Sequence, residues 1–195
     1  MNNTFIFTPL LTVKLYNTHK KVKNMNQNKV IVIIVILVTL SMPVLAQWDV
    51  SNSTDEMTGK TTAYCSSPIT YPTKSMDFPY SDTQAWLGIG CDGDTEWVYI
   101  GFTNEPNLLN TNTEDRYNAI STRIKWDDDL LNESFTQIWG AKFIHFKNDW
   151  IAIQNVMKSN TLLVELNWHG NGKTYFKFNL AGSSKAIAEM RARCK

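Results

Sequence analysis

The sequence has few of the residues and motifs from which most enzyme sites are built. Its 195 residues include three His and three Cys. There is no C-x-x-C pair, no H-E-x-x-H, no G-x-S-x-G and no glycine-rich phosphate loop. Of the histidines, His145 fits a strand face and His169 a turn, so neither is a convincing general base. We therefore expect no catalytic residues, no metal site and no cofactor.

A long membrane-spanning run is also missing, although the N-terminal part contains a shorter apolar segment. Residues 30–46 read VIVIIVILVTLSMPVLA, preceded by Lys29 and ending in small residues. Basic, apolar and small-residue regions in this order are typical of a secretory signal peptide. We expect cleavage after Ala46, which makes residues 1–46 a leader and residues 47–195 a single β-rich domain.

Two features of the leader have alternatives. Translation starts either at Met1 or, as we favour, at Met25, since residues 1–24 show no consistent period. An uncleaved anchor is the alternative to cleavage. However, the apolar run is interrupted by Ser41 and Pro43 and is shorter than the ~20 residues of a spanning helix. We expect no stable membrane span in the mature form and a periplasmic or secreted location.

The mature chain lacks an excess of basic charge. The leader contains five Lys and no acidic residue, which leaves 14 basic and 18 acidic side chains among 149 residues, a net charge of about −4. Proteins that bind the phosphate backbone are usually basic, so we expect no nucleic-acid partner. This length corresponds to one ordinary domain.

Strand signals dominate the mature sequence. Two apolar runs, 85–91 and 95–102, flank Asp92-Gly93, a dipeptide typical of tight hairpins. Further strands are expected at 60–65, at 117–126, at 136–147 with a kink near Gly140, and in a hairpin of 161–168 with 173–180. In the last of these, Phe176, Phe178 and Leu180 should face inward because alternate residues of a strand share a face.

Two segments have helical spacing. The first runs from 149 to 160 with Asp149 as its N-cap, and the second from 183 to 194, capped by Ser183 or Ser184. The sequence therefore predicts a mainly β fold, an antiparallel β-sandwich with one or two short helices including a C-terminal helix.

Three cysteines allow one disulfide and leave one thiol over. A bridge between Cys91 and Cys194 would tie the C-terminal tail to the core, and it would stabilise the fold by roughly 4 kcal/mol. Cys65 would then be free, either buried or paired with another chain.

Several motifs, in order, resemble the VasI/TagO-type periplasmic proteins associated with type VI secretion. The resemblance spans nearly the whole mature chain, and its most specific part is the closing FNLAGSSKAIAEMRARC. The other motifs are W-x-V-S from Trp48 with a following D-x-M-T, the apolar strand ending at Cys91, and STRIKWDDD around Arg123.

The resemblance implies a non-enzymatic accessory domain with no catalytic residues. By position, only Cys91, Arg123 and Cys194 of this sequence are matched to residues of the family's pattern. Two residues depart from the pattern, because Ser183 stands where a bulky apolar residue is preferred and Cys65 is an addition.

Acidic residues, one arginine and the tryptophans are the remaining candidates for a site. Asp92, Asp94 and Glu96 alternate around a turn and 127–129 is an acidic run, either of which could hold Ca²⁺, but turn and cap roles are favoured. Arg123 either points inward to a carboxylate partner or, as we favour, lies exposed on a strand.

The mature chain holds seven Trp, a high content for its length. Trp48, Trp97 and Trp150 fit core positions. Trp126, Trp139 and Trp168 lie beside polar residues at strand ends, and an exposed cluster of them would form a binding surface for a protein or for sugar rings. For any single Trp a core position is favoured, so the surface hypothesis requires at least two of them to converge.

Together these features predict an exported, non-enzymatic envelope protein that binds a protein partner in the envelope or in a secretion system, as the resemblance implies. One alternative is a glycan-binding or hydrolytic envelope protein. Another is an inhibitor or immunity protein for a secreted hydrolase.

Overall fold

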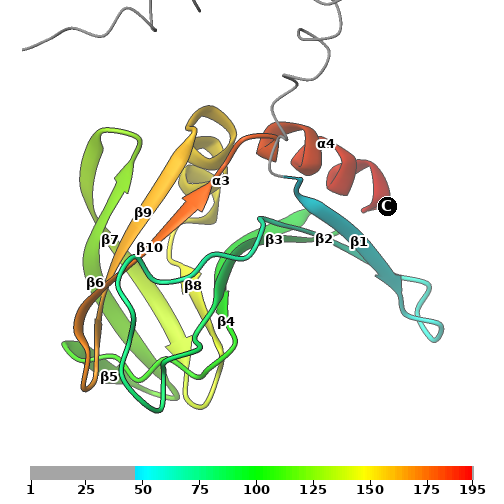
Figure 1. Ribbon diagram of the computed structural model, residues 1–195. Helices are drawn as coiled ribbons and strands as arrows, with labels where there is room; N and C mark the ends of the chain where they lie inside the picture. Colours follow the sequence, from blue (N-terminus) through cyan, green and yellow to red (C-terminus); the bar gives the residue numbers. More distant parts are fainter. Residues whose placement is uncertain (1–46, 195) are drawn as a thin grey trace, which may run out of the picture. The chain divides into compact units, whose positions relative to one another are not determined.

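The computed structural model describes residues 47–194 (Figure 1). The expected leader, with its start and cleavage sites, lies outside the described residues. The strands and helices are β1 (Asp49–Thr54), β2 (Thr61–Ser66), β3 (Ala85–Asp92), β4 (Thr95–Phe102), β5 (Thr111–Glu114), β6 (Tyr117–Trp126), β7 (Asp129–Ile138), β8 (Phe143–Phe146), α3 (Asp149–Lys158), β9 (Thr161–Trp168), β10 (Gly172–Asn179) and α4 (Ser183–Arg193).

The predicted mainly antiparallel β fold with a C-terminal helix is confirmed. The strands form one ten-stranded sheet in the order β1-β2-β3-β4-β8-β7-β6-β9-β10, and β5 pairs with β6. This sheet curls round, and a loop closes the gap between its two sides. Thr70 bridges to Ala85 of β3 and donates its hydroxyl to the Lys177 carbonyl of β10 (2.8 Å). The two layers around the core are therefore parts of one sheet.

Alternation of side chains along the strands builds a single core. Phe176, Phe178 and Leu180 are buried, as predicted, while Tyr175 and Lys177 lie on the other face. Equivalent inward positions of the neighbouring strands complete one cluster of apolar side chains. The core thus follows from the two-residue period of the sequence.

The segment expected to be one kinked strand is two strands. Gly140 lies at the turn between β7 and β8 with φ +75°, a left-handed conformation that favours glycine. β7 begins at Asp129 and pairs with β6 over its whole length. The sequence did not predict the first half of β7 because it is exposed on both faces and lacks alternating apolar residues.

The two helices begin at Asp149 and Ser183, where the predicted segments begin, but their N-caps are Asn148 and Gly182 rather than the predicted residues. Asn148 caps α3 by accepting the Ile151 N–H (3.1 Å), whereas the Asp149 carboxylate accepts the Val98 N–H of β4 (2.7 Å). α4 begins after Gly182, and the hydroxyl of buried Ser183 donates to the Val156 carbonyl of α3 (2.7 Å). This bond accounts for a serine at a buried position.

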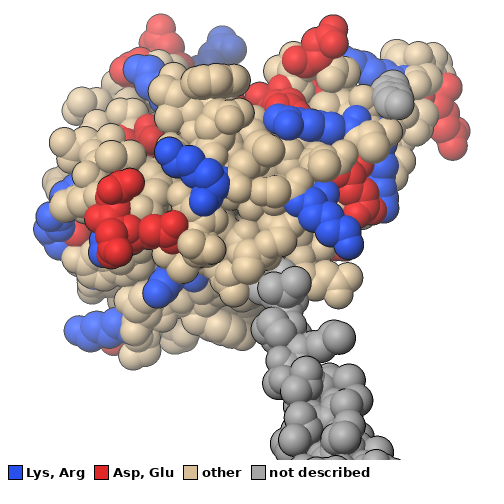
Figure 2. Space-filling model, turned by 90° about the horizontal axis from the view of Figure 1, so that it is seen from above, with Lys and Arg blue, Asp and Glu red and all other residues tan. Residues whose placement is uncertain are grey.

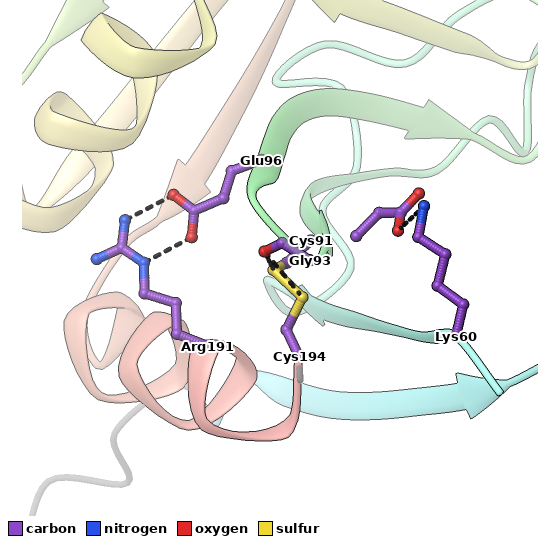
Figure 3. The surroundings of a disulfide bond; sticks show 7 residues. Lys60, Cys91, Gly93, Glu96, Arg191 and Cys194 are labelled. Carbon is purple, nitrogen blue, oxygen red and sulfur yellow. Dashed lines mark hydrogen bonds and ion pairs between the residues drawn. A yellow bond between two sulfur atoms is a disulfide. The ribbon is translucent and has the colours of Figure 1, made fainter.

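A disulfide joins Cys91 to Cys194 across 103 residues, which confirms the predicted bridge. It fastens the end of α4 to β3, and α4 lies alongside β1 (Figures 1 and 3). Cys65 is the remaining thiol and is buried, and burial raises its pKa to about 12. Among the described residues, no helix has the length and apolar character needed to cross a bilayer.

Candidate functional site

The tryptophans do not form the expected exposed cluster. Trp126 and Trp168 are 3% and 0% exposed, so both are core residues, as favoured for a single Trp, and the hypothesis of a surface shared with Trp139 is wrong. On their strands they have the same parity as Ile124 and Leu166, which face the core. Their polar sequence neighbours point the other way, which explains why the strand ends looked like surface.

Two tryptophans do lie on the surface. Trp139 is 61% exposed and directly follows β7. Trp150, for which the sequence suggested a core position, is 71% exposed on α3. Trp97 is half-buried on the outside of the sheet, and of the three expected core positions only Trp48 is buried.

Arg123 lies on the outer face of β6 and pairs with Glu165 of β9. Its Nε and Nη2 atoms lie 3.2 and 2.5 Å from the two carboxylate oxygens. The Tyr175 hydroxyl also donates to Glu165 (2.8 Å), and Lys173 lies 3.5 Å away. Arg123 is thus an exposed strand residue with a carboxylate partner, and Glu165 is the largely buried centre of a small charge network.

This network predicts a pH-dependent contribution to stability. Hydrogen bonds from Arg123 are the main reason that the pKa of Glu165 is lowered. A carboxyl with a lowered folded-state pKa stabilises the fold above its unfolded pKa, and this contribution is lost as pH falls through the folded pKa. We expect Glu165→Gln to lower the free energy of unfolding by about 1–2 kcal/mol at neutral pH.

The difference should shrink towards zero between neutral pH and an acidic pH below the lowered folded-state pKa of Glu165, because the wild-type carboxyl is then protonated as well. Urea unfolding of both proteins at the two pH values checks this. Glu56→Gln, in the exposed β1–β2 loop, is the matched control and should have little effect at either pH. An equal loss for Glu165→Gln at both pH values would contradict the electrostatic explanation.

Several of the acidic residues considered as Ca²⁺ ligands have other partners. Asp92 pairs with Lys60 (2.6 Å) and Glu96 with Arg191 (2.6 and 2.8 Å), as Figure 3 shows for Glu96. Asp127 accepts the backbone N–H of Thr161 (2.8 Å), which ties the β6–β7 turn to β9. Within residues 47–194, no three potential metal-ligating side chains gather at one place.

An aromatic surface that the sequence analysis missed covers the outside of the sheet. We call it the outer aromatic face. It extends over four adjacent strands, and its rings belong to Tyr64 of β2, Trp86 of β3, Trp97 and Tyr99 of β4, and Phe143 and His145 of β8.

Glycines lie beneath three of these rings. Gly88, Gly90 and Gly101 pair with Tyr99, Trp97 and Trp86 respectively. A Cβ atom at any of the three would lie 2.3–2.4 Å from the ring opposite. The rings therefore lie against bare backbone, where only glycine leaves room. The turn at DGD sets the register of the two strands in AWLGIGC-DGD-TEWVYIGF. In that register each of these aromatic residues lies opposite a glycine of the other strand.

The rings of the outer aromatic face also contact each other. Tyr99 and Trp86 each meet Phe143 edge to face, with ring centroids 5.5 and 6.2 Å apart. Tyr64 meets Trp97 in the same way at 6.0 Å. Burial lowers the pKa of His145, so its imidazole is neutral at neutral pH. The face is thus a preorganised, uncharged surface that remains partly open to solvent.

A second feature is a hollow of about 590 Å³ around Trp139. Its walls come from the β7–β8 turn, from residues 79–80 and from residues 104–108. It shares no lining residue with the outer aromatic face.

Charged side chains are interspersed on the face viewed in Figure 2. Lys and Arg lie among Asp and Glu at the end of the domain that carries α3 and α4, without a large area of one sign (Figure 2). This surface therefore offers no extended basic patch to a polyanion.

Comparison of the chain with models of protein families, with curated proteins and with solved structures finds no match.

Proposed function

We propose that this chain is an exported, non-enzymatic envelope protein that binds a protein partner, like the type VI secretion accessory proteins that its sequence resembles. The observation that carries the proposal is the outer aromatic face. Six partly exposed ring side chains on four strands form a patch much larger than scattered single apolar residues, and patches of this kind mark interaction sites.

The composition of the face suits a protein partner. Protein interfaces have aromatic centres depleted in charge, surrounded by polar residues. Around the rings lie uncharged hydroxyl side chains on the same side of the sheet, since Ser51 pairs with Tyr64 and Thr136 with His145. Because Tyr and Trp rings lose little conformational freedom on binding, a preformed array of them gives affinity at low entropic cost.

Export is supported by the disulfide. Bridges such as Cys91–Cys194 form and persist in oxidising compartments, which include the periplasm and the extracellular space. The signal-like run at 30–46 agrees with this destination.

A charge placed within the outer aromatic face should abolish partner binding. Phe143 is 40% exposed, so Phe143→Asp puts a carboxylate among the rings without opening the core. We expect the tagged full chain, recovered from the envelope under oxidising conditions, to capture one specific partner, and the variant to lose it at least tenfold. Quantitative mass spectrometry of the captured proteins measures this.

Leu130→Asp is the matched control, because Leu130 is also exposed but lies in the β6–β7 hairpin, away from the face. It should capture the partner as the wild type does. Equal capture by the Phe143→Asp variant would show that the outer aromatic face is not the docking surface. The partner's identity separates the accessory role from the inhibitor alternative, since the latter requires a secreted hydrolase.

A further inference from the structure

The hollow around Trp139 presents a different chemistry from the outer aromatic face. We propose that it binds an uncharged sugar ring of an oligosaccharide, with the Trp139 indole as the stacking surface. This site is independent of the proposed protein docking, since the two surfaces share no lining residue.

The indole is both exposed and held in place. The Trp139 Nε1 donates to the Asn118 Oδ1 (3.2 Å), which fixes the ring at the rim of the hollow. With 61% of the residue exposed, a broad ring face remains free. The electron-rich face of an indole attracts the polarised C–H groups of a pyranose, as it attracts other positively polarised groups.

Carboxamides supply the polar part of the hollow. Gln137 is buried and donates both amide hydrogens, to the carbonyls of Pro106 (2.9 Å) and Ala141 (3.1 Å). Its Oε1 has no donor within residues 47–194 and remains an acceptor for a ligand. Because the two donated bonds join both walls of the hollow, the shape of the site is fixed before any ligand arrives.

Two further amides have complementary free groups. The Asn118 Oδ1 already accepts from Thr113 (3.2 Å) as well as Trp139, so its Nδ2 is the group left to donate. The Asn104 Nδ2 donates to Thr83 (3.0 Å) and Asp82 (3.3 Å), which leaves its Oδ1 to accept. The hollow thus offers both hydrogen-bond donors and hydrogen-bond acceptors. A sugar hydroxyl needs both kinds of partner, because each hydroxyl donates one hydrogen bond and accepts others.

The charge of the lining selects against acidic ligands. The lining includes Glu105 but no Lys or Arg. A phosphate or carboxylate would therefore enter without a cationic partner and next to a carboxylate, which is unfavourable. Neutral sugars avoid this cost.

Titration of the full chain with neutral trisaccharides tests the proposal. The probes are tri-N-acetylchitotriose, maltotriose and mannotriose, with sialyllactose as the charged comparison, and calorimetry measures affinity. We expect at least one neutral probe to bind. Trp139→Ala should weaken that binding at least tenfold. Asn107→Ala should weaken it several-fold, since Asn107 lines the hollow and its side chain has no hydrogen-bond partner within the described residues.

Trp150→Ala is the matched control, because Trp150 is also largely exposed but lies on α3 and lines a different hollow. It should bind as the wild type does. Failure of all three neutral probes, equal loss for the Trp150 variant, or tighter binding of sialyllactose would each overturn the proposal. Because Phe143 does not line this hollow, loss of partner capture by Phe143→Asp with unchanged sugar affinity would support both assignments separately.

Discussion

Replacing both Cys91 and Cys194 with alanine should lower the free energy of unfolding by about 4 kcal/mol. The bridge joins two residues that lie 103 positions apart in the sequence. Without it, the unfolded chain gains conformational entropy over most of the domain. It also releases α4, whose Arg191 reaches Glu96 and whose Arg193 donates to the Val50 carbonyl of β1 (2.9 Å). Urea unfolding of the wild type and the variant measures the loss.

Reduction of the wild type should reproduce the effect of the double variant. Cys65→Ala is the control, and it should remain as sensitive to reductant as the wild type is. Cys65 is buried, and burial raises the pKa of its thiol to about 12, which disfavours the thiolate that would attack a disulfide. Loss of reductant sensitivity in Cys65→Ala would mean that the bridge involves Cys65.

The second large effect is expected at Trp168, which is fully buried. Its ring packs against Tyr80, Phe102 and Phe176, with centroids 5.4, 5.5 and 6.1 Å away. Trp168→Ala should lower the free energy of unfolding by about 3–5 kcal/mol, because it leaves a large cavity where sheet and loop meet. Chemical denaturation, followed by the fluorescence of the remaining tryptophans, measures the change.

Trp139→Ala is the control here, since exposed Trp139 should change stability by less than about 0.5 kcal/mol. Trp168→Phe should lower the free energy of unfolding by less than half as much as Trp168→Ala, because phenylalanine keeps an aromatic ring in the core. It also removes an indole N–H that has no hydrogen-bond partner within the described residues. Similar losses for the alanine variants at Trp139 and Trp168 would contradict the division into surface and core.

Local chemistry explains which parts of the fold were predictable. The β3–β4 hairpin followed from Asp92-Gly93, whose glycine has φ +66°. The inward row of β10 followed from a strict alternation of apolar and polar residues. The first half of β7 has neither signal, because both of its faces contact solvent. The closure of the sheet depends on Thr70, which lies in a loop without a periodic sequence pattern.

The candidate sites were harder to predict because they depend on which face a residue occupies. Trp126 and Trp168 were candidates for a surface cluster because their sequence neighbours are polar, although consecutive residues of a strand point to opposite faces. The outer aromatic face was missed because its rings look like core residues until Gly88 and Gly90 are seen to lie beneath them. The Trp139 hollow joins three distant segments, whose meeting only the folded chain shows.

Photo-crosslinking from the outer aromatic face in intact cells shows whether a partner docks on this face. With p-benzoylphenylalanine at position 143, we expect a crosslink to one specific envelope protein. The same group at position 130, in the β6–β7 hairpin, should give no such product. A crosslink from position 130 alone, or the same set of products from both positions, would contradict partner binding through this face.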